Sequence, residues 1–158
     1  MGRNDAQILM ESLEKKNRIL DEVIRENAVQ ETILTAEELD MDALDVSTER
    51  LGELAEQLER LDDGFEALYD RIREELMTHK DSYRSEISGM QALIGQITDK
   101  VVKINAARMR NERQAKKAFQ NARDQIGRTA SQARVSRSYF NNMNRLNYVG
   151  PQFYDNKK

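Results

Sequence analysis

The chain has 158 residues, of which 34% are charged and 39% apolar, with seven Gly, one Pro and no Trp. This balance is typical of long solvated helices and argues against a sheet-rich fold, which needs more turn residues. The absence of Cys excludes disulfide bonds and a thiolate zinc site, and no run approaches the roughly 18 apolar residues of a membrane span. We therefore expect a soluble, cytoplasmic, all-α protein.

Charge is distributed unevenly along the chain, although the net charge is only -3. The first hundred residues carry 12 Lys and Arg against 25 Asp and Glu, whereas residues 101–158 carry 13 basic residues against three acidic ones. This asymmetry indicates an acidic body and a basic C-terminal arm.

A first helix is predicted between about Asp5 and Leu34, where apolar residues recur at helical spacing. Its stripe contains Leu9, Leu13, Leu20 and Ile24. Beyond it, Thr35 and Glu38 have the spacing of a capping box, which would mark the start of the next helix.

The strongest pattern is a heptad seam in the middle of the chain, made of Leu44, Leu51, Leu58, Phe65 and Ile72 with Leu54, Leu61 and Leu68 interleaved. A second seam follows in a different phase, made of Ile87, Met90, Ile94, Ile97, Val101 and Ile104. The phase change predicts either a break at 78–82 or one continuous helix of about 60 residues. We favour the break, because the two seams then cover each other. The expected fold is an elongated antiparallel helical hairpin or a three-helix coiled-coil bundle with a C-terminal extension.

The C-terminal part has a weaker pattern. The apolar stripe thins past Met109, so we expect declining order and a helical domain that spans residues 1–135. Residues 136–158 are rich in Asn and aromatic side chains and are predicted to form a tail outside the core. Aromatic side chains on such a tail are candidate anchors for a partner protein. They are Tyr139, Phe140, Tyr148, Phe153 and Tyr154.

No sequence pattern indicates a catalytic, cofactor-binding or metal site. His79 is the single histidine and has no second ligand at a metal-binding spacing, and paired acids such as Asp62 and Asp63 fit solvated helix faces. Basic residues between 100 and 137 could contact phosphates, but the acidic body would repel a polyanion. We therefore expect no enzyme, no cofactor, no nucleic-acid partner and no membrane insertion, and favour an acidic protein surface as the counterpart of the basic arm.

Three segments, SLEKKNRILDEVIRENAVQETIL, LERLDDGFEALYDRI and SYFNNMNRLNYVGPQFYDNKK, resemble the FlgN/FliT-type flagellar type III export chaperones. The resemblance implies a cytoplasmic, ATP-independent chaperone that binds terminal helices of late flagellar subunits, such as hook-filament junction or cap proteins, and delivers them to the export gate. It also implies that the C-terminal aromatic residues contact the export apparatus. The candidate client-binding residues, Leu9, Leu13, Leu20 and Ile24, fit a plain helical core equally well.

Two other functions are compatible with the sequence. A structural coiled-coil scaffold would use the continuous-helix arrangement and form a rod-like oligomer. A nucleic-acid binder would use residues 100–137 and lose affinity steeply as salt rises. The sequence leaves open whether the chain forms a homodimer.

Overall fold

The protein is built from helices throughout the part of the chain that its computed structural model describes, which comprises residues 2–127 and 129–145. The helices are, in chain order, α1 (Gly2–Leu34), α2 (Met41–Thr78), α3 (Arg84–Ile126) and α4 (Ala130–Arg145). The prediction of an all-α fold is confirmed. The first three helices, of 33, 38 and 43 residues, span the length of the bundle, whereas α4 has only 16 residues.

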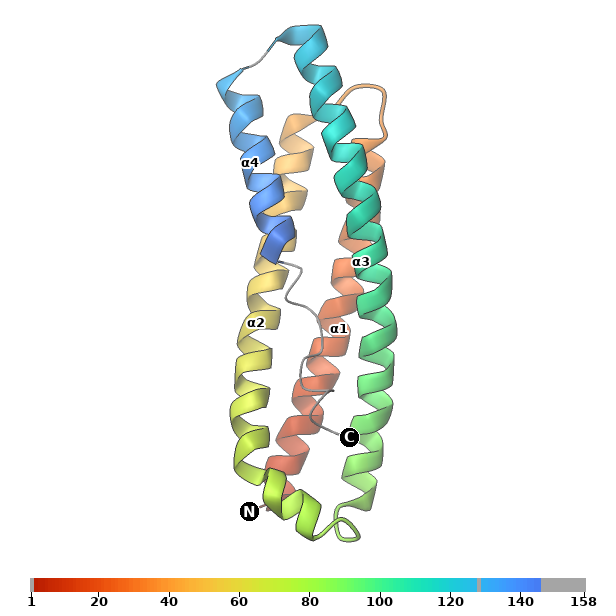
Figure 1. Ribbon diagram of the computed structural model, residues 1–158, viewed down its shortest axis with the longest axis vertical. Coiled ribbons are helices and arrows are strands. Elements are labelled where there is room, and N and C mark those ends of the chain that lie inside the picture. Colours follow the sequence, from red (N-terminus) through yellow and green to blue (C-terminus); the bar gives the residue numbers. More distant parts are fainter. Residues whose placement is uncertain (1, 128, 146–158) are drawn as a thin grey trace.

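Helix α1 lies between α2 and α3 and packs against both of them (Figure 1). Two ion pairs fix its direction relative to α2: Lys16 lies 2.6 Å from Asp62, and Asp5 lies 3.8 Å from Arg71. The residue numbers rise on one helix as they fall on the other, so α1 and α2 are antiparallel.

Helices α1 and α3 run parallel to each other. The Lys100 ammonium lies 2.8 Å from Asp21, and the Asn111 side chain donates to the Asn27 carbonyl at 2.9 Å, so both sets of numbers rise together. Helix α4 packs mainly against α2 and touches α3 more lightly. The four helices therefore surround the axis in the order α1, α2, α4, α3, with α2 and α3 diagonally opposed.

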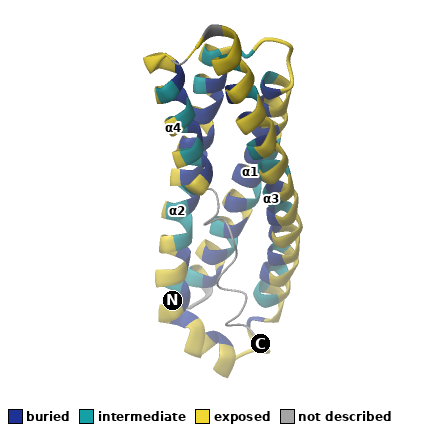
Figure 2. Cartoon of the chain, turned by 45° about the horizontal axis from the view of Figure 1, so that its top comes forward, coloured by how far each residue is buried: buried dark blue, intermediate teal, exposed yellow. Residues whose placement is uncertain are grey.

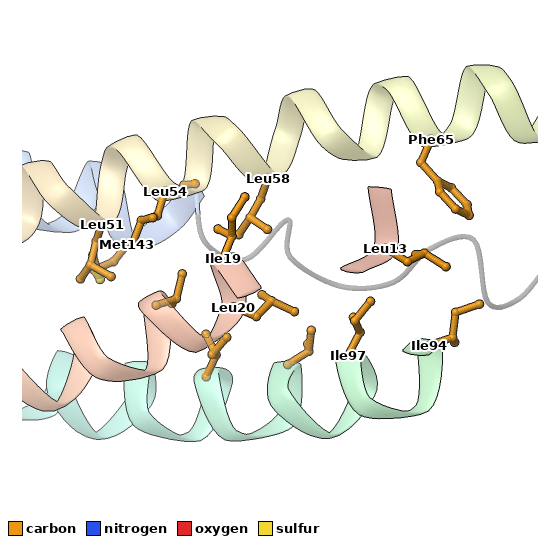
Figure 3. Packing of buried hydrophobic residues seen from close by; sticks show 14 of the residues in the cluster. Leu13, Ile19, Leu20, Leu51, Leu54, Leu58, Phe65, Ile94, Ile97 and Met143 are labelled. Atoms are coloured by element: carbon orange, nitrogen blue, oxygen red, sulfur yellow. The ribbon is translucent and has the colours of Figure 1, made fainter. Parts of the chain in front are cut away.

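The two predicted seams form the core of the bundle. All five residues at the first heptad position, from Leu44 to Ile72, are buried, and so are Met90 to Ile104 of the second seam. Figure 3 shows Leu13 of α1 between Phe65 of α2 and Ile97 of α3. Buried residues line the inside of the bundle and exposed residues its outside (Figure 2), as expected for amphipathic helices.

The predicted break between the seams is confirmed, but the expectation that the two seams cover each other is wrong, because α1 lies between α2 and α3 and packs against both. Helix α2 ends at Thr78 and α3 begins at Arg84. The intervening turn is held by backbone hydrogen bonds, since the amide of His79 donates to Glu75 and that of Tyr83 donates to His79. The continuous helix that a rod-like scaffold would use is therefore not formed.

The predicted capping box before α2 is wrong. The Thr35 hydroxyl donates back to the Glu31 carbonyl at 2.8 Å, so it belongs to the end of α1. Helix α2 is instead capped by Asp40, whose carboxylate accepts from the amide of Ala43 at 3.0 Å. Asp is a favoured cap because its short side chain reaches the unpaired amides of the first turn.

The C-terminal part is more ordered than the sequence predicted. Helix α3 continues to Ile126 and ends at Gly127, whose φ of 86° suits glycine at a helix C-terminus. Helix α4 then runs across the expected boundary at residue 135. Its buried face is formed by Gln132, Val135, Tyr139 and Met143. The expectation that Tyr139 lies outside the core is wrong, because three- and four-residue spacing places it on that face.

Helix α4 covers only part of the bundle and thereby divides it into two halves. The four-helix half comprises α4 with residues 18–34, 41–59 and 105–126, since α4 extends along α2 from an ion pair at Asp45 to one at Glu59. The three-helix half comprises residues 4–17, 60–78 and 84–104 of the described helices.

The interiors of the two halves differ in polarity. In the four-helix half, the buried polar side chains are Glu26, Asn27, Gln30, Ser47, Thr48, Asn111 and Gln132. The three-helix half contains one buried charged side chain among the described residues, Lys16. The core of the three-helix half is therefore mostly apolar, whereas that of the four-helix half contains several polar side chains.

Candidate functional site

The four residues predicted to bind a client lie on α1, and the structure places them mainly in the core. Leu9, Leu13 and Leu20 have side chains that are at most 1% exposed, and Ile24 is half-buried. Leu9 alone also lines a surface groove. A client could therefore reach the other two leucines only if the packed helices moved apart.

A shallow apolar groove runs between α1 and α2 on the surface of the three-helix half. We call it the α1–α2 groove, and it has a volume of about 350 Å³. Helix α1 contributes Ile8, Leu9, Glu11, Ser12 and Lys15, and α2 contributes Arg60, Leu61, Gly64, Phe65 and Leu68. Ile8 is 51% exposed, so about half of this apolar side chain is accessible at the groove.

Glycine gives the α1–α2 groove its depth on the α2 side. A Cβ atom at Gly64 would meet no other atom within 4 Å, so open space lies above the backbone there. Leu61 and Leu68, three residues before it and four after it, are only half-buried. Because residues three and four apart share a helix face, these three positions form a low point flanked by two apolar side chains.

Ion pairs join α1 to α2 on either side of the groove. Asp5 and Arg71 pair at 3.8 Å towards one end of the bundle. Towards the other end, the buried Glu26 carboxylate accepts from Arg50 at 3.2 Å and from the Ser47 hydroxyl at 2.7 Å. These contacts join the two helices beyond both ends of the groove, although the exposed pair at Arg71 contributes little to stability.

A buried ion pair lies on the inner side of the same two helices. The Lys16 ammonium is 2% exposed and lies 2.6 Å from Asp62, which is 27% exposed. Burial raises the pKa of the Asp62 carboxyl above its usual range, although the Lys16 charge acts in the opposite direction. The contact joins the middle of α1 to the middle of α2 and so supports the register of the two helices that form the groove.

Two of the predicted docking aromatics lie on α4. Tyr139 is fully buried and packs edge-on against Phe140, with ring centroids 5.0 Å apart, while Phe140 is half-buried. Burial, and to a lesser extent the charge of Glu112, raise the pKa of the Tyr139 hydroxyl well above its usual value. Tyr139 is therefore inaccessible to a partner in this structure. The predicted anchors Tyr148, Phe153 and Tyr154 lie outside the described residues.

The residues considered for a metal site and for a nucleic-acid site do not gather at one place in the structure. His79 is exposed at the end of α2, and no group of three or more His, Asp or Glu side chains among the described residues is arranged to hold a metal. Within the basic segment, Arg108 is paired with Glu112 at 3.2 Å, whereas Arg110 and Arg113 are exposed on the outer face of α3.

The sequence reading missed most of the groove. Leu61 and Leu68 occupy the second heptad position, and the pattern alone assigns them to the core. The neighbouring Gly64 was the available signal, since a glycine inside a helix lowers its stability and can mark a position where open space has a functional use. The exposure of Ile8 had no signal, because it depends on how α1 is rotated against its neighbours.

Comparison with known proteins adds no relationship: no protein-family model matches the chain, and neither the curated proteins nor the solved structures contain a significant match. The resemblance to flagellar export chaperones therefore stays a prediction. Among the described helices, none combines the length and apolar character needed to cross a membrane.

Proposed function

We propose that this protein is an export chaperone that holds an amphipathic helix of a client protein in the α1–α2 groove. The observation that carries the proposal is the combination of exposed or half-buried apolar side chains at Ile8, Leu61 and Leu68 with open space above Gly64. Apolar side chains left at the surface in a concave arrangement mark binding sites more often than chance exposure.

A helix is the form of client that this groove fits best. Two packed helices present parallel ridges, and a third helix can insert its own ridge between them. The apolar face of such a helix would cover Ile8, Leu61 and Leu68, and each large apolar side chain buried contributes about 1.5 to 3 kcal/mol. Helix-in-groove recognition of this kind uses anchors spaced three and four residues apart.

The surroundings of the groove also suit a helical client. The rim carries both signs of charge, from Glu11 and Lys15 on the α1 side and from Arg60 on the α2 side. The ion pairs at Arg50 and Arg71 lie 21 positions apart on α2, which corresponds to about 32 Å of helix. A client helix of about 20 residues could therefore lie along this face between them.

The class of client comes from the sequence resemblance. The segment LERLDDGFEALYDRI, one of the three that resemble FlgN/FliT-type chaperones, supplies every residue that α2 contributes to the groove. We therefore propose late flagellar subunits, such as hook-filament junction or cap proteins, as clients, with the protein acting in the cytoplasm. The C-terminal aromatic residues Tyr148, Phe153 and Tyr154 are proposed to contact the export apparatus.

Two glycine variants test the proposal with a matched control. Gly64 lies in the groove, whereas Gly95 is exposed on α3, and a Cβ atom at either would meet nothing within 4 Å. Gly64→Glu places a charge and bulk in the groove, and Gly95→Glu makes the same chemical change elsewhere. Both variants replace glycine by a good helix former, so both should fold.

The binding measurement is fluorescence anisotropy with labelled peptides from the terminal helices of junction and cap subunits of the same genome. We expect at least one peptide to bind the wild type with a micromolar Kd. Gly64→Glu should raise this Kd about tenfold or more, and Gly95→Glu should leave it within about twofold. Equal affinities for the two variants, or no binding by any of these peptides, would contradict the proposal.

A further inference from the structure

A second groove lies on the other side of the bundle, between α3 and α4. We call it the α3–α4 groove. It has a volume of about 380 Å³. Helix α3 contributes Lys116, Phe119, Gln120 and Arg123, and α4 contributes Gln132, Ala133, Ser136, Arg137 and Phe140. It exists because α4 packs closely on α2 and only lightly on α3, which leaves the two helices apart along this side (Figure 1).

The α3–α4 groove combines an apolar floor with a cationic rim. The rings of Phe119 and Phe140 have centroids 6.2 Å apart and form the aromatic part of the lining. Lys116 and Arg123 from α3 and Arg137 from α4 supply positive charge from both sides, and none of the described residues that line the groove is acidic. A ligand that fits must therefore carry both apolar and negatively charged groups.

The charges on the rim are largely available to a ligand. Lys116 is 68% exposed and lies 3.7 Å from Glu112, a distance at which an exposed ion pair contributes little. Arg123 donates to the neutral Gln120 amide at 2.6 Å, so its charge is not compensated there. Arg137 is exposed, and no ion pair joins it to another described residue.

One more apolar side chain belongs to this surface. Met109 lies seven residues before Lys116, on the same face of α3, and is 52% exposed. It extends the apolar surface by about 10 Å along α3 beyond the groove.

We infer that the α3–α4 groove binds an acidic amphipathic helix of a partner protein. The helix places apolar side chains on Phe119, Phe140 and Met109, and its carboxylates lie against the cations of the rim. This surface is separate from the α1–α2 groove, because α4 and α1 lie diagonally opposite each other in the bundle. The inference therefore goes beyond the proposed client site and does not depend on it.

A nucleic acid fits this surface less well than an acidic helix does. Helix α4 has the cations of α3 on one side, but on its other side lies α2, with the exposed acids Glu49, Glu53 and Glu56. A long polyanion following the cations across α4 would meet these carboxylates and be repelled. A short acidic helix confined to the groove avoids them.

A charge-reversal pair tests the inference. The double variant Lys116→Glu/Arg137→Glu reverses two exposed cations of the groove. The control Lys103→Glu/Arg110→Glu makes the same change in net charge at two exposed positions of α3, seven residues apart, that line neither groove and lie on a different face from Met109 and Lys116. Because all four side chains are exposed, both variants should keep the wild-type helical content and unfolding midpoint, which circular dichroism measures.

The probe is a labelled synthetic peptide of about 18 residues, with Leu and Phe at helical three- and four-residue spacing and Glu elsewhere. A second peptide carries Lys in place of Glu, and a third probe is a single strand of about 20 thymidine nucleotides. We expect the acidic peptide to bind, with affinity reduced about tenfold by the groove variant and less than about twofold by the control. The Lys peptide should not bind.

Three results would overturn the inference. The first is absence of binding by the acidic peptide at low salt. The second is an equal loss in the two variants, which would assign the binding to net charge alone. The third is tighter binding of the oligonucleotide than of the peptide, which would make the basic surface a nucleic-acid site. Gly64→Glu, tested in the same assay, should leave the affinity for the acidic peptide unchanged, so failure of one groove is distinguishable from failure of the other.

Discussion

The two halves of this bundle reach a packed interior in different ways. The three-helix half relies on leucine, isoleucine and aromatic side chains, whereas the four-helix half buries amides, hydroxyls and a carboxylate alongside them. In the four-helix half several buried polar atoms have no hydrogen-bond partner among the residues that the structure describes, including the Thr48 and Tyr139 hydroxyls and the side-chain amides of Asn27 and Gln30. A buried polar group without a partner costs about 1 to 3 kcal/mol. A buried side chain in the four-helix half can therefore contribute less to the stability of the fold than an equally buried side chain in the three-helix half.

The largest expected effect is the loss of a leucine from the three-helix half. Leu13 is 1% exposed and lies among side chains of α2 and α3, so Leu13→Ala removes apolar contacts and leaves a cavity. We expect the free energy of unfolding in urea to fall by about 2 to 5 kcal/mol. The control Ile8→Ala, at a side chain 51% exposed, should cost less than about 1 kcal/mol.

The next largest effect is a gain in stability, and it is expected in the four-helix half. Thr48→Val replaces a fully buried hydroxyl that has no partner by a methyl group of similar shape. We expect the variant to be more stable than the wild type by about 1 kcal/mol, because the cost of burying the hydroxyl is removed. Tyr139→Phe should change the urea midpoint in the same direction. A lowered midpoint for both variants would mean that these hydroxyls stabilise the fold.

A smaller difference separates two glycines of α2. Gly64→Ala should raise the unfolding free energy by about 0.5 to 1 kcal/mol, because alanine favours the helix and meets no neighbour in the three-helix half. Gly52→Ala should gain less or lose stability, since its Cβ would overlap the Asn142 amide of α4. Thermal unfolding of the two variants measures the difference. Equal gains would show that α4 accommodates the added methyl group at position 52 without loss of unfolding free energy.

The smallest effect is a pH dependence in the three-helix half. The pKa of Asp62 is raised above its ordinary value of 3.8 in the folded protein, so its contribution to stability is complete below that value and is lost as pH rises through the folded-state pKa. Relative to Asp62→Asn, the wild type should gain stability as pH falls through this window. Urea titrations at a series of pH values measure the slope. The reverse slope would mean that attraction by Lys16 outweighs desolvation.

The sequence was sufficient for most of the fold. Heptad spacing gave the buried residues of α2 from Leu44 to Ile72, and the change of phase gave the break between α2 and α3. Both succeed because a repeat of three and four residues must place one helix face against a neighbour. Helix order around the axis did not follow from the pattern, since the same stripes would also be buried with α2 and α3 side by side.

Two parts of the molecule could not be read from the sequence. Tyr139 lies in a segment so rich in Asn and aromatic side chains that its pattern indicated a tail, yet packing against α2 stabilises α4 as a helix. The groove residues Leu61 and Leu68 look like core positions, and only the rotation of α1 against α2 decides their exposure. Both outcomes depend on tertiary contacts, which override local preference.

The parallel arrangement of α1 and α3 has a consequence for biosynthesis. The hydrogen bond between Asn27 and Asn111 spans 84 positions of the chain, so the second neighbour of α1 leaves the ribosome long after α1 itself. Until then the nascent α1–α2 hairpin exposes an apolar stripe that α3 will later cover. Contacts between residues so far apart in sequence form slowly, and uncovered stripes associate with other chains in the meantime. A protein proposed to cover the apolar helices of its clients is therefore itself synthesised with an apolar helix face that stays uncovered until α3 has been made.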